Sequence, residues 1–250
     1  MTKLLELTLP TAAENLALDE ALLESVDQGD NPNAPNSVDV FRLWEPTAPF
    51  VVIGRSSKVA EEVNLAYCHE NQIAVHRRCS GGASVVAGPG CLMYAVVISL
   101  HRHPELRMIE RAHAFVLRNI QNGLRQAGLT TEMNGTSDLT IGDHAAGIRK
   151  ISGNSLRCKR NAILYHGTIL CDADLANISR CLRTAPRQPS YRHGRDHAEF
   201  IANLGVSTSL IRLGLIDCWN VDGTLDTWPV DETNRLAADR YSSEAWNLRH

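Results

Sequence analysis

The strongest constraint on the fold comes from residues 92–100 (LMYAVVISL), a nearly continuous apolar run with β-branched side chains at its centre. Such a run is typical of a strand buried on both faces, because a half-exposed strand alternates apolar and polar residues. Residues 162–171 (AILYHGTILC) have the same character, and we expect them to pair with residues 149–152 across a turn near 159–161. The chain therefore needs a sheet that is covered on both sides.

Helical patterns supply the covering elements. Apolar residues recur at spacings of three and four from Met108 to Ala127, and Gly128 follows as a helix-ending residue. Thr11 and Glu14 have the spacing of a capping box, which predicts the start of another helix.

Shorter patterns complete the prediction of the fold. Residues 58–70 predict an amphipathic helix, and residues 183–199, which are polar and contain two prolines, predict a mobile surface segment. Strands and helices mixed in irregular order favour an α+β fold, an α/β sandwich whose sheet is mixed and mainly antiparallel. The length of 250 residues favours a single domain that spans residues 1–250.

Composition excludes several classes of protein. The net charge of −3, without a long run of one sign, argues against nucleic-acid binding. Seven scattered cysteines without a Cys-x-x-Cys pair indicate reduced thiols rather than a disulfide framework or a metal site. The N-terminus lacks the shape of a signal peptide, and no stretch is apolar enough to span a bilayer. We therefore expect a soluble, cytoplasmic protein.

The first stretch with chemical potential is residues 76–85 (HRRCSGGASV). Gly81 and Gly82 can adopt backbone conformations that expose N–H groups to a ligand, and Arg77 and Arg78 add forked cationic donors that suit carboxylate or phosphate. The stretch predicts an anion-binding bend. The alternative, for this stretch taken alone, is a tight hairpin with two solvated arginines.

The second stretch is residues 147–155 (GIRKISGNS). On a strand, Lys150 and Ser152 point to one face, and Gly153 leaves space beside the lysine. A lysine in an apolar setting can meet a developing oxyanion or a phosphate. The alternative is a lysine at a strand edge with its ammonium group in water.

Two further positions have a functional and a structural interpretation. Asp138, in the segment that begins at Asn134, can position a Mg²⁺-bound phosphate or can form an Asx-type turn. His166 lies inside the second apolar run, where a structural or pocket-lining role is favoured over that of a base.

Taken together, these motifs resemble the lipoate–protein ligase catalytic domain, of the biotin and lipoate ligase fold. The resemblance rests on RR-x-SGG at 77–82, KISGN at 150–154, HGTIL at 166–170, LALDEA at 16–21, VVIGR at 51–55 and YSSEAWN at 241–247. It implies an enzyme that activates lipoate with ATP to lipoyl-adenylate and then transfers the lipoyl group to a lysine of an acceptor domain. Lipoate or octanoate, ATP and Mg²⁺ would be substrates, with no permanently bound metal.

The resemblance also implies roles for residues. Lys150 would be catalytic, contacting the acyl carbonyl and the phosphate, and Asp138 would contact Mg²⁺. The acyl tunnel would come from strands such as residues 51–53 and 92–97. The residues implied to bind substrate or nucleotide are Arg77, Arg78, Ser80, Gly81, Gly82, Ala83, Asn134, Asp138, Ser152, Gly153, Asn154, His166, Gly167 and Thr168.

Two departures and three alternatives accompany this interpretation. Ala83 replaces the family's third glycine, and residues 87–90 (AGPG) replace its following His-Asp pair. No C-terminal accessory domain is evident, so activation could need a separate subunit. The acceptor would be a glycine cleavage H protein or a 2-oxoacid dehydrogenase E2 domain.

The alternatives are an octanoyl or lipoyl transferase with a cysteine thioester at Cys181 or Cys79, a biotin ligase, and a non-catalytic lipoyl-binding protein.

Overall fold

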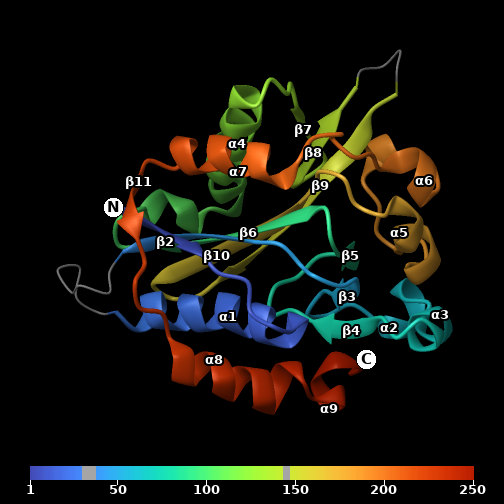
Figure 1. Cartoon of the computed structure of the whole chain (residues 1–250), viewed down its shortest axis with the longest axis horizontal. Helices are drawn as coiled ribbons and strands as arrows, with labels where there is room; N and C mark the ends of the chain where they lie inside the picture. The colour runs from blue at the N-terminus through green and yellow to red at the C-terminus, as the bar shows by residue number, and fades with distance from the viewer. Residues whose placement is uncertain (30–37, 143–146) are drawn as a thin grey trace.

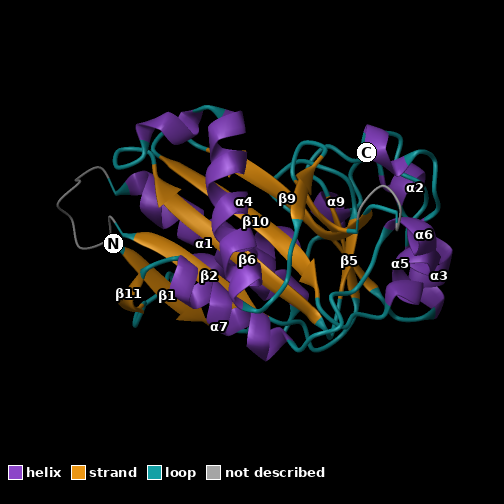
Figure 2. Ribbon diagram, turned by 90° about the horizontal axis from the view of Figure 1, so that it is seen from above, coloured by secondary structure: helices purple, strands orange, loops and turns teal. Residues whose placement is uncertain are grey.

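The computed structural model describes residues 1–29, 38–142 and 147–250. Within them, a sheet of eight strands crosses the molecule, and its two central strands are the two apolar runs of the sequence (Figures 1 and 2). In order across the sheet, the strands are β11 (Val221–Thr224), β1 (Thr2–Glu6), β2 (Asp39–Trp44), β6 (Cys91–Ser99), β10 (Ala162–Leu170), β9 (Arg149–Cys158), β8 (Asp138–Ile141) and β7 (Glu132–Asn134). β1 runs parallel to both of its neighbours and the other pairs are antiparallel, which confirms the mixed, mainly antiparallel sheet.

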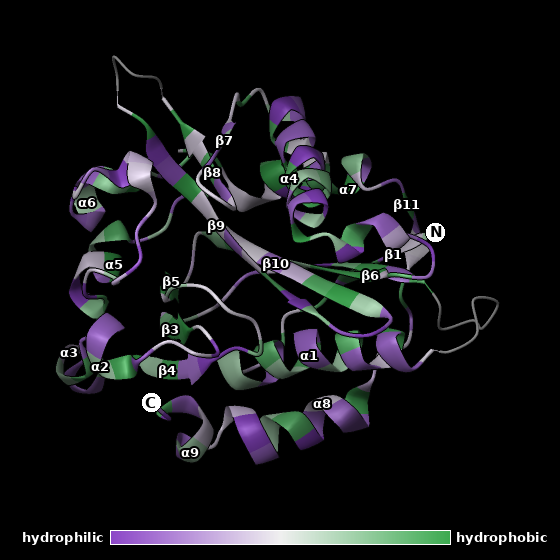
Figure 3. Ribbon diagram, turned by 180° about the vertical axis from the view of Figure 1, so that it is seen from behind, coloured by the Kyte–Doolittle hydropathy of each residue, from purple (hydrophilic) through white to green (hydrophobic). Residues whose placement is uncertain are grey.

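The central strands are buried as their composition predicts. Every residue of β6 is buried, and hydrophobic residues line this strand in Figure 3. β10 pairs with β6 on one side and with β9 on the other, so the second apolar run pairs with the following part of the predicted strand, residues 152–158, and only Ser152 of the expected residues 149–152 takes part. The residues that carry the KISGN and HGTIL motifs therefore lie on adjacent strands.

Helices cover both faces of the sheet, which confirms the α+β fold. α1 (Ala12–Gln28) lies on one face with α8 (Val230–Leu236) on its outer side, and α4 (Ile109–Gln126) and α7 (Thr208–Cys218) lie on the other (Figure 1). The capping box forms at α1, where Thr11 and Glu14 exchange side-chain and backbone hydrogen bonds. Gly128, with φ of 81°, follows the end of α4 as predicted.

A second sheet of three strands lies on the same side of the large sheet as α1 (Figures 1 and 3). Its central strand, β3 (Phe50–Ile53), is parallel to β4 (Ala74–Arg77) and antiparallel to β5 (Val85–Ala87). The RR-x-SGG motif connects β4 to β5. The small sheet thus places this motif close to the motifs on β9 and β10.

One helix prediction is wrong. Residues 58–70 form two short helices, α2 (Val59–Glu62) and α3 (Leu65–Glu70), instead of one. Val63 is extended and pairs with Leu182, and the Asn64 side chain then caps α3. The long-range pairing and the local cap together interrupt the helical pattern.

The remaining elements are α5 (Leu175–Cys181), α6 (His197–Phe200), α9 (Glu244–Asn247), short 3-10 turns at Pro104–Arg107 and Ser190–Arg192, and a π-helical turn at Ala237–Tyr241. Among the described residues, no helix has the length and apolar character needed to cross a membrane.

Candidate functional site

Two adjoining cavities lie where the two sheets meet. The first, of about 360 Å³, runs from the apolar side chains of Leu16, Trp44, Val52 and Met93 to the segment around Asp138. The second, of about 110 Å³, is lined by apolar side chains and by several arginines. Both are lined by Lys150 and by the residues that follow the glycine bend, which we define as residues 80–83. Lys150 therefore lies where the two cavities meet.

The ammonium group of Lys150 is held by one carboxylate. Lys150 Nζ lies 2.8 Å from Asp138 Oδ1, and the lysine side chain is 25% exposed. Tyr191 donates a hydrogen bond of 2.8 Å to Asp138 Oδ2, so this carboxylate orients two side chains. A Cβ atom at Gly153 would lie 2.9 Å from both Cε and Nζ of Lys150, which confirms that the glycine leaves space for the lysine.

The glycine bend is held from inside by Arg78. The buried guanidinium group donates to Ser80 Oγ at 3.1 Å, to Ala83 O at 2.9 Å and to Gly81 O, and burial lowers the pKa of Arg78 to about 10. Gly82 adopts φ of 85°, a conformation that favours glycine. Within the described residues, the backbone N–H groups of Gly81, Gly82 and Ala83 donate to no protein acceptor. The carbonyl groups of Gly81 and Ala83 thus accept from Arg78, that of Gly82 accepts from the Ser57 hydroxyl, and the N–H groups of the bend are left for another acceptor.

A chain of buried polar groups connects the bend to α1. Ser80 Oγ lies 2.6 Å from His166 Nε2, and His166 Nδ1 lies 3.3 Å from Asp19 Oδ2. Arg42 lies 2.6 Å from the other oxygen of Asp19. Burial raises the pKa of Asp19, but Arg42 and His166 together outweigh burial and bring that pKa below its ordinary value. An ionised Asp19 therefore orients His166, which agrees with the structural interpretation of this histidine.

The side chain of Asn154 forms several hydrogen bonds at the wall of the first cavity. Its amide nitrogen donates to Ser137 O at 2.7 Å, and its amide oxygen accepts from the hydroxyl of Tyr94. A Cβ atom at Gly167 would lie 1.8 Å from Asn154 Oδ1, so the HGTIL motif needs glycine at this position.

The structure brings most of the predicted site residues to the cavities, but not all. Those that line the first are Arg78, Gly82, Ala83, Asp138, Lys150, Gly153, Asn154, His166, Gly167 and Thr168, and Ser152 lines the second. Ser80 and Gly81 line neither cavity, but they form hydrogen bonds with His166 and Ser155, which line the first. Asn134 lies outside it and donates to Thr140 Oγ1.

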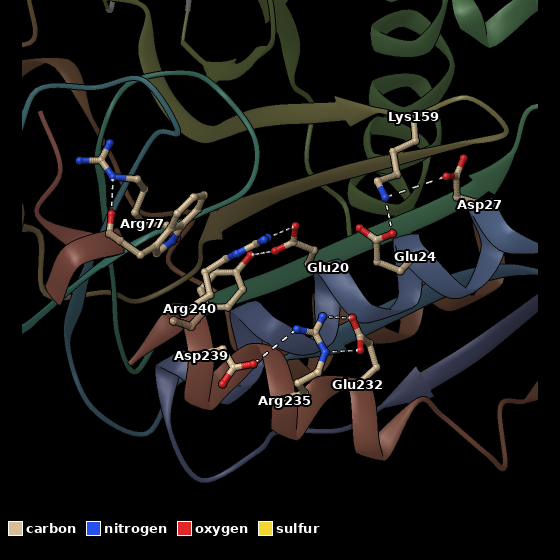
Figure 4. Close-up of polar contacts among 11 residues, drawn as sticks. Glu20, Glu24, Asp27, Arg77, Lys159, Glu232, Arg235, Asp239 and Arg240 are labelled. Carbon is tan, nitrogen blue, oxygen red and sulfur yellow. Dashed lines mark hydrogen bonds and ion pairs between the residues drawn. The ribbon is translucent and has the colours of Figure 1, made fainter. Parts of the chain in front are cut away.

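Arg77 differs from the prediction that it lines the lipoyl and phosphate region. Its guanidinium group is buried and donates to the carbonyls of Gly54 and Ser57 at 2.8 Å, and also to those of Trp246 and Arg249 in the C-terminal segment. Figure 4 shows the bond from the Arg77 guanidinium group to the C-terminal segment. Trp246 in turn donates to Arg77 O. Successive residues of a strand point to opposite faces, so the neighbour of Arg78 points away from the cavities. Arg77 thus fastens the C-terminal segment to β4.

The same segment is also fastened to α1. Arg240 and Tyr241 both bond to Glu20, the residue after Asp19 (Figure 4). In α1, Asp19 thus faces the first cavity while Glu20 faces the C-terminal segment.

Asp138 as a Mg²⁺ ligand stays a prediction. Both of its oxygens are engaged, by Lys150 and by Tyr191. The part of the chain that the structure describes holds no group of three His, Cys, Asp or Glu side chains that could bind a metal ion. These residues do not assemble a metal site by themselves.

The cysteines lie away from the cavities. No cysteine of the described residues lines either cavity. Burial raises the pKa of Cys79 to about 12, that of Cys181 to about 12 and that of Cys91 to about 11. These thiols are therefore protonated near neutral pH and are poor nucleophiles.

Sequence reasoning missed several lining residues. Arg187, Gln188 and Pro189 line the first cavity, and Tyr191 bonds to Asp138, although residues 183–199 were expected at a mobile surface. The prolines and charges of this segment are typical of an exposed loop, but in the structure the segment packs against the site. Asp19 carried a signal in its position within LALDEA, but the pattern did not show which acidic residue faces the cavity.

Comparison with known proteins is consistent with this geometry. Residues 11–206 match the family model described as the lipoyl protein ligase A/B catalytic domain. The chain is 28% identical to lipoate-protein ligase A subunit 1 of Thermoplasma acidophilum, over 94% of this chain and 91% of that protein. It is 27% identical to the probable lipoate-protein ligase A of Mycoplasma pneumoniae, over 94% of this chain and 67% of that protein.

Solved structures give the same result. A bi-partite lipoate protein ligase from T. acidophilum, solved with its E2 lipoyl domain, superposes with a TM-score of 0.80 at 26% identity, covering 100% of this chain and 96% of that one. A T. acidophilum structure with bound lipoic acid gives 0.76 at 26% identity, covering 99% and 97%. A lipoate-protein ligase A bound with ATP gives 0.73 at 26% identity, also covering 99% and 97%.

Proposed function

Because the chain belongs to the lipoyl protein ligase A/B catalytic-domain family, we propose that it activates lipoate with ATP and transfers the lipoyl group to a lysine of an acceptor domain. One observation carries the proposal: Lys150 lies where an apolar cavity and a cation-rimmed cavity meet, beside the glycine bend. A mixed anhydride of a fatty acid and a nucleotide needs such a pair of compartments, with a cation at the junction.

The first cavity suits the acyl chain. Its apolar end is formed by Leu16, Trp44, Val52 and Met93, and burying the methylene groups of lipoate or octanoate there is favourable by about 0.8 kcal/mol each. The carboxylate of such a chain would lie toward Lys150. Val52 of β3 and Met93 of β6 line this wall, which supports the proposal of an acyl tunnel between these strands.

The second cavity suits the nucleotide side. Its walls combine apolar side chains such as Ile178 and Phe200 with Arg183, Arg187 and Arg192. Gly82 lines the first cavity and Ala83 lines both, so their N–H groups, which have no acceptor within the described residues, can donate to phosphate oxygens.

The reaction follows in two steps. A carboxylate oxygen of lipoate attacks the α-phosphorus of ATP, the bond from that phosphorus to the bridging oxygen breaks, and pyrophosphate leaves. The ε-amine of the acceptor lysine then attacks the acyl carbon, the bond from that carbon to the AMP oxygen breaks, and the amine releases a proton to water. Lys150 stabilises the negative charge that grows on the phosphate in the first step and on the carbonyl oxygen in the second. Mg²⁺ would enter with ATP, since the described residues form no metal site without it.

A cysteine-dependent transferase is the second candidate, but the thiols argue against it. Cys79 and Cys181 are buried, and the pKa of each is raised to about 12. A thioester mechanism needs an accessible thiolate next to the acyl cavity. The first cavity, as far as it is described, has no cysteine in its lining.

The acceptor and a second subunit belong to the same proposal. The T. acidophilum relative is named subunit 1 and is bi-partite, and this chain covers 91% of it. We infer that this chain acts on a lipoyl domain, such as that of a 2-oxoacid dehydrogenase E2 or a glycine cleavage H protein, and that activation requires an accessory subunit.

The mass of an apo lipoyl domain tests the function. The chain is incubated with that domain and either ATP, Mg²⁺ and lipoate or a preformed lipoyl-adenylate. We expect the mass of one lipoyl group to be added from the adenylate by the chain alone, and from ATP only when the accessory subunit is present. Modification from an octanoyl carrier protein without ATP would instead establish the transferase, and no modification from any donor would refute both.

A further inference from the structure

Arg192 is a buried cation without a full set of partners. It is 5% exposed and lies in the 3-10 turn at Ser190–Arg192, on the wall of the second cavity. Its Nε donates to Arg195 O at 2.8 Å, and its Cζ lies 4.8 Å from the ring centre of Phe200. The terminal nitrogen Nη2 is buried and has no hydrogen-bond partner within the described residues.

The surroundings of Arg192 neutralise it only in part, because Asp196 raises its pKa but the effect of burial outweighs that attraction. Lys150, Arg183 and Arg187 also line the second cavity, and Glu62 is its acidic lining residue. One oxygen of Glu62 already accepts hydrogen bonds from the backbone N–H of Ser84 at 2.7 Å and from its hydroxyl group at 2.8 Å. The cavity therefore carries an excess of positive charge.

His197 adds no charge near neutral pH. It lies on the same wall, and burial, followed by repulsion from Arg192, lowers its pKa below the ordinary value. Burial also lowers the pKa of Arg192, but a guanidinium group stays protonated at neutral pH. The positive charge on this wall thus comes from permanent cations.

A buried guanidinium nitrogen that lacks an acceptor is costly, and such groups usually complete their hydrogen bonds with a ligand or a partner. We propose that Arg192 binds the β- and γ-phosphates of ATP and hence the pyrophosphate that leaves in the activation step. This inference rests on the proposed function, because it assigns the condensed-phosphate end of the nucleotide to one wall of the same site. A forked guanidinium group suits two neighbouring phosphate oxygens.

The position of Arg192 favours phosphate over the other anions of the reaction. The lipoate carboxylate would approach Lys150 from the first cavity, whose lining does not include Arg192. An acidic protein surface could reach the exposed Arg187, whereas Arg192 lies inside a cavity of about 110 Å³. Of the anions in the reaction, the phosphates of ATP are therefore the ones that can approach Arg192 in this cavity.

The same segment offers a matched control. Arg195 is on the same turn, and its Cζ lies 5.5 Å from the ring centre of Phe200, but it lines neither of the two cavities. Arg192→Met and Arg195→Met remove the same charge from positions three residues apart. Only the first variant removes a group that faces the second cavity.

The test measures binding of inorganic pyrophosphate with Mg²⁺ to the chain alone by titration calorimetry. We expect Arg192→Met to weaken this binding about 10- to 100-fold, the effect of losing charge-assisted hydrogen bonds, and Arg195→Met to change it less than about 3-fold. Arg192→Lys should restore part of the affinity, and it replaces Arg192→Met if that variant fails to fold. Equal binding by wild type and the Arg192 variant, or equal losses in both methionine variants, would overturn the assignment.

A second readout separates this inference from the proposed function. Transfer from preformed lipoyl-adenylate to an apo lipoyl domain needs no pyrophosphate subsite, so Arg192→Met should retain that rate. Lipoate-dependent pyrophosphate release from ATP, with the accessory subunit present, should fall by the factor seen in binding. Loss of transfer together with activation would assign Arg192 to the fold instead, whereas failure of the wild-type chain to modify any acceptor would refute the proposed function.

Discussion

Gly153→Ala tests whether the placement of Lys150 controls the rate. A Cβ atom at this position would lie 2.9 Å from Cε and Nζ of Lys150, whereas ordinary contact begins at 3.4 Å. The ammonium group must therefore shift by about 0.5 Å (3.4 − 2.9) from its present place beside Asp138. A misplacement of about 1 Å can cost about 100-fold in rate, so a shift of half that size should cost about 10-fold.

The effect on stability should be small. The clash involves the far end of a flexible side chain rather than backbone, and the lysine can move toward the cavity. Replacing glycine by alanine also restricts the unfolded chain, which stabilises by about 0.4–1 kcal/mol where the backbone allows it. We therefore expect the free energy of unfolding to change by less than about 1 kcal/mol.

The assay is the single-turnover rate of lipoyl transfer from preformed lipoyl-adenylate to an apo lipoyl domain, together with urea unfolding. Lys150→Ala/Gly153→Ala is the control, because the alanine at 153 has nothing to displace once the lysine is shortened, so any stability cost of Gly153→Ala should vanish in it. An unchanged rate in Gly153→Ala would refute the placement argument. A loss of stability above about 2 kcal/mol would show that the contact is with rigid structure.

Three further predictions concern the surroundings of the site. Arg77→Met should lower the free energy of unfolding by about 3 kcal/mol, because several buried carbonyl groups lose their hydrogen-bond donor. Urea denaturation measures this change, and a loss below about 1 kcal/mol would show that other contacts hold the C-terminal segment. Cys79→Ser and Cys181→Ser should each retain lipoyl transfer from the adenylate, and abolished transfer in a folded variant would revive the thioester mechanism. Asp19 has a lowered pKa, so its contribution to stability is present above its ordinary value of about 3.9 and is lost as the pH falls through the native value. Wild type should therefore exceed Asp19→Asn in stability by more at pH 7 than at pH 3, and an equal difference at both pH values would contradict the ion pair with Arg42.

The sequence predicted those parts of the fold that depend on local pattern. The apolar run of residues 92–100 became the buried strand β6, and the capping box at Thr11 became the start of α1, because burial and capping act within a few residues. The space that Gly153 leaves for Lys150 was predicted, but the alternation of a regular strand would put these residues, three apart, on opposite faces. They come together because the register of β8 and β9 is irregular between Leu139 and Thr140, a long-range feature of the pairing.

The parts that depend on long-range packing were not predictable. The helix expected at 58–70 breaks because Val63 pairs with Leu182, which is far away in the sequence. Arg77 and Arg78 look equivalent in sequence. In the structure, however, only Arg78 lines the first cavity, whereas Arg77 forms hydrogen bonds to the C-terminal segment. The residues of 183–199 that line the site, such as Arg192, become visible only once this segment folds over β9 and β10.

The central claim is that Lys150 lies between an acyl compartment and a nucleotide compartment. The most direct measurement is a crystal structure of the chain with a non-hydrolysable lipoyl-adenylate analogue that carries a sulfamoyl group in place of the phosphate. We expect the lipoyl chain to lie along Trp44 and Met93, the sulfamoyl group to lie within hydrogen-bonding distance of Lys150 Nζ and the bend N–H groups, and the nucleoside to lie in the second cavity. An analogue bound with its sulfamoyl group away from Lys150, or outside both cavities, would contradict the account.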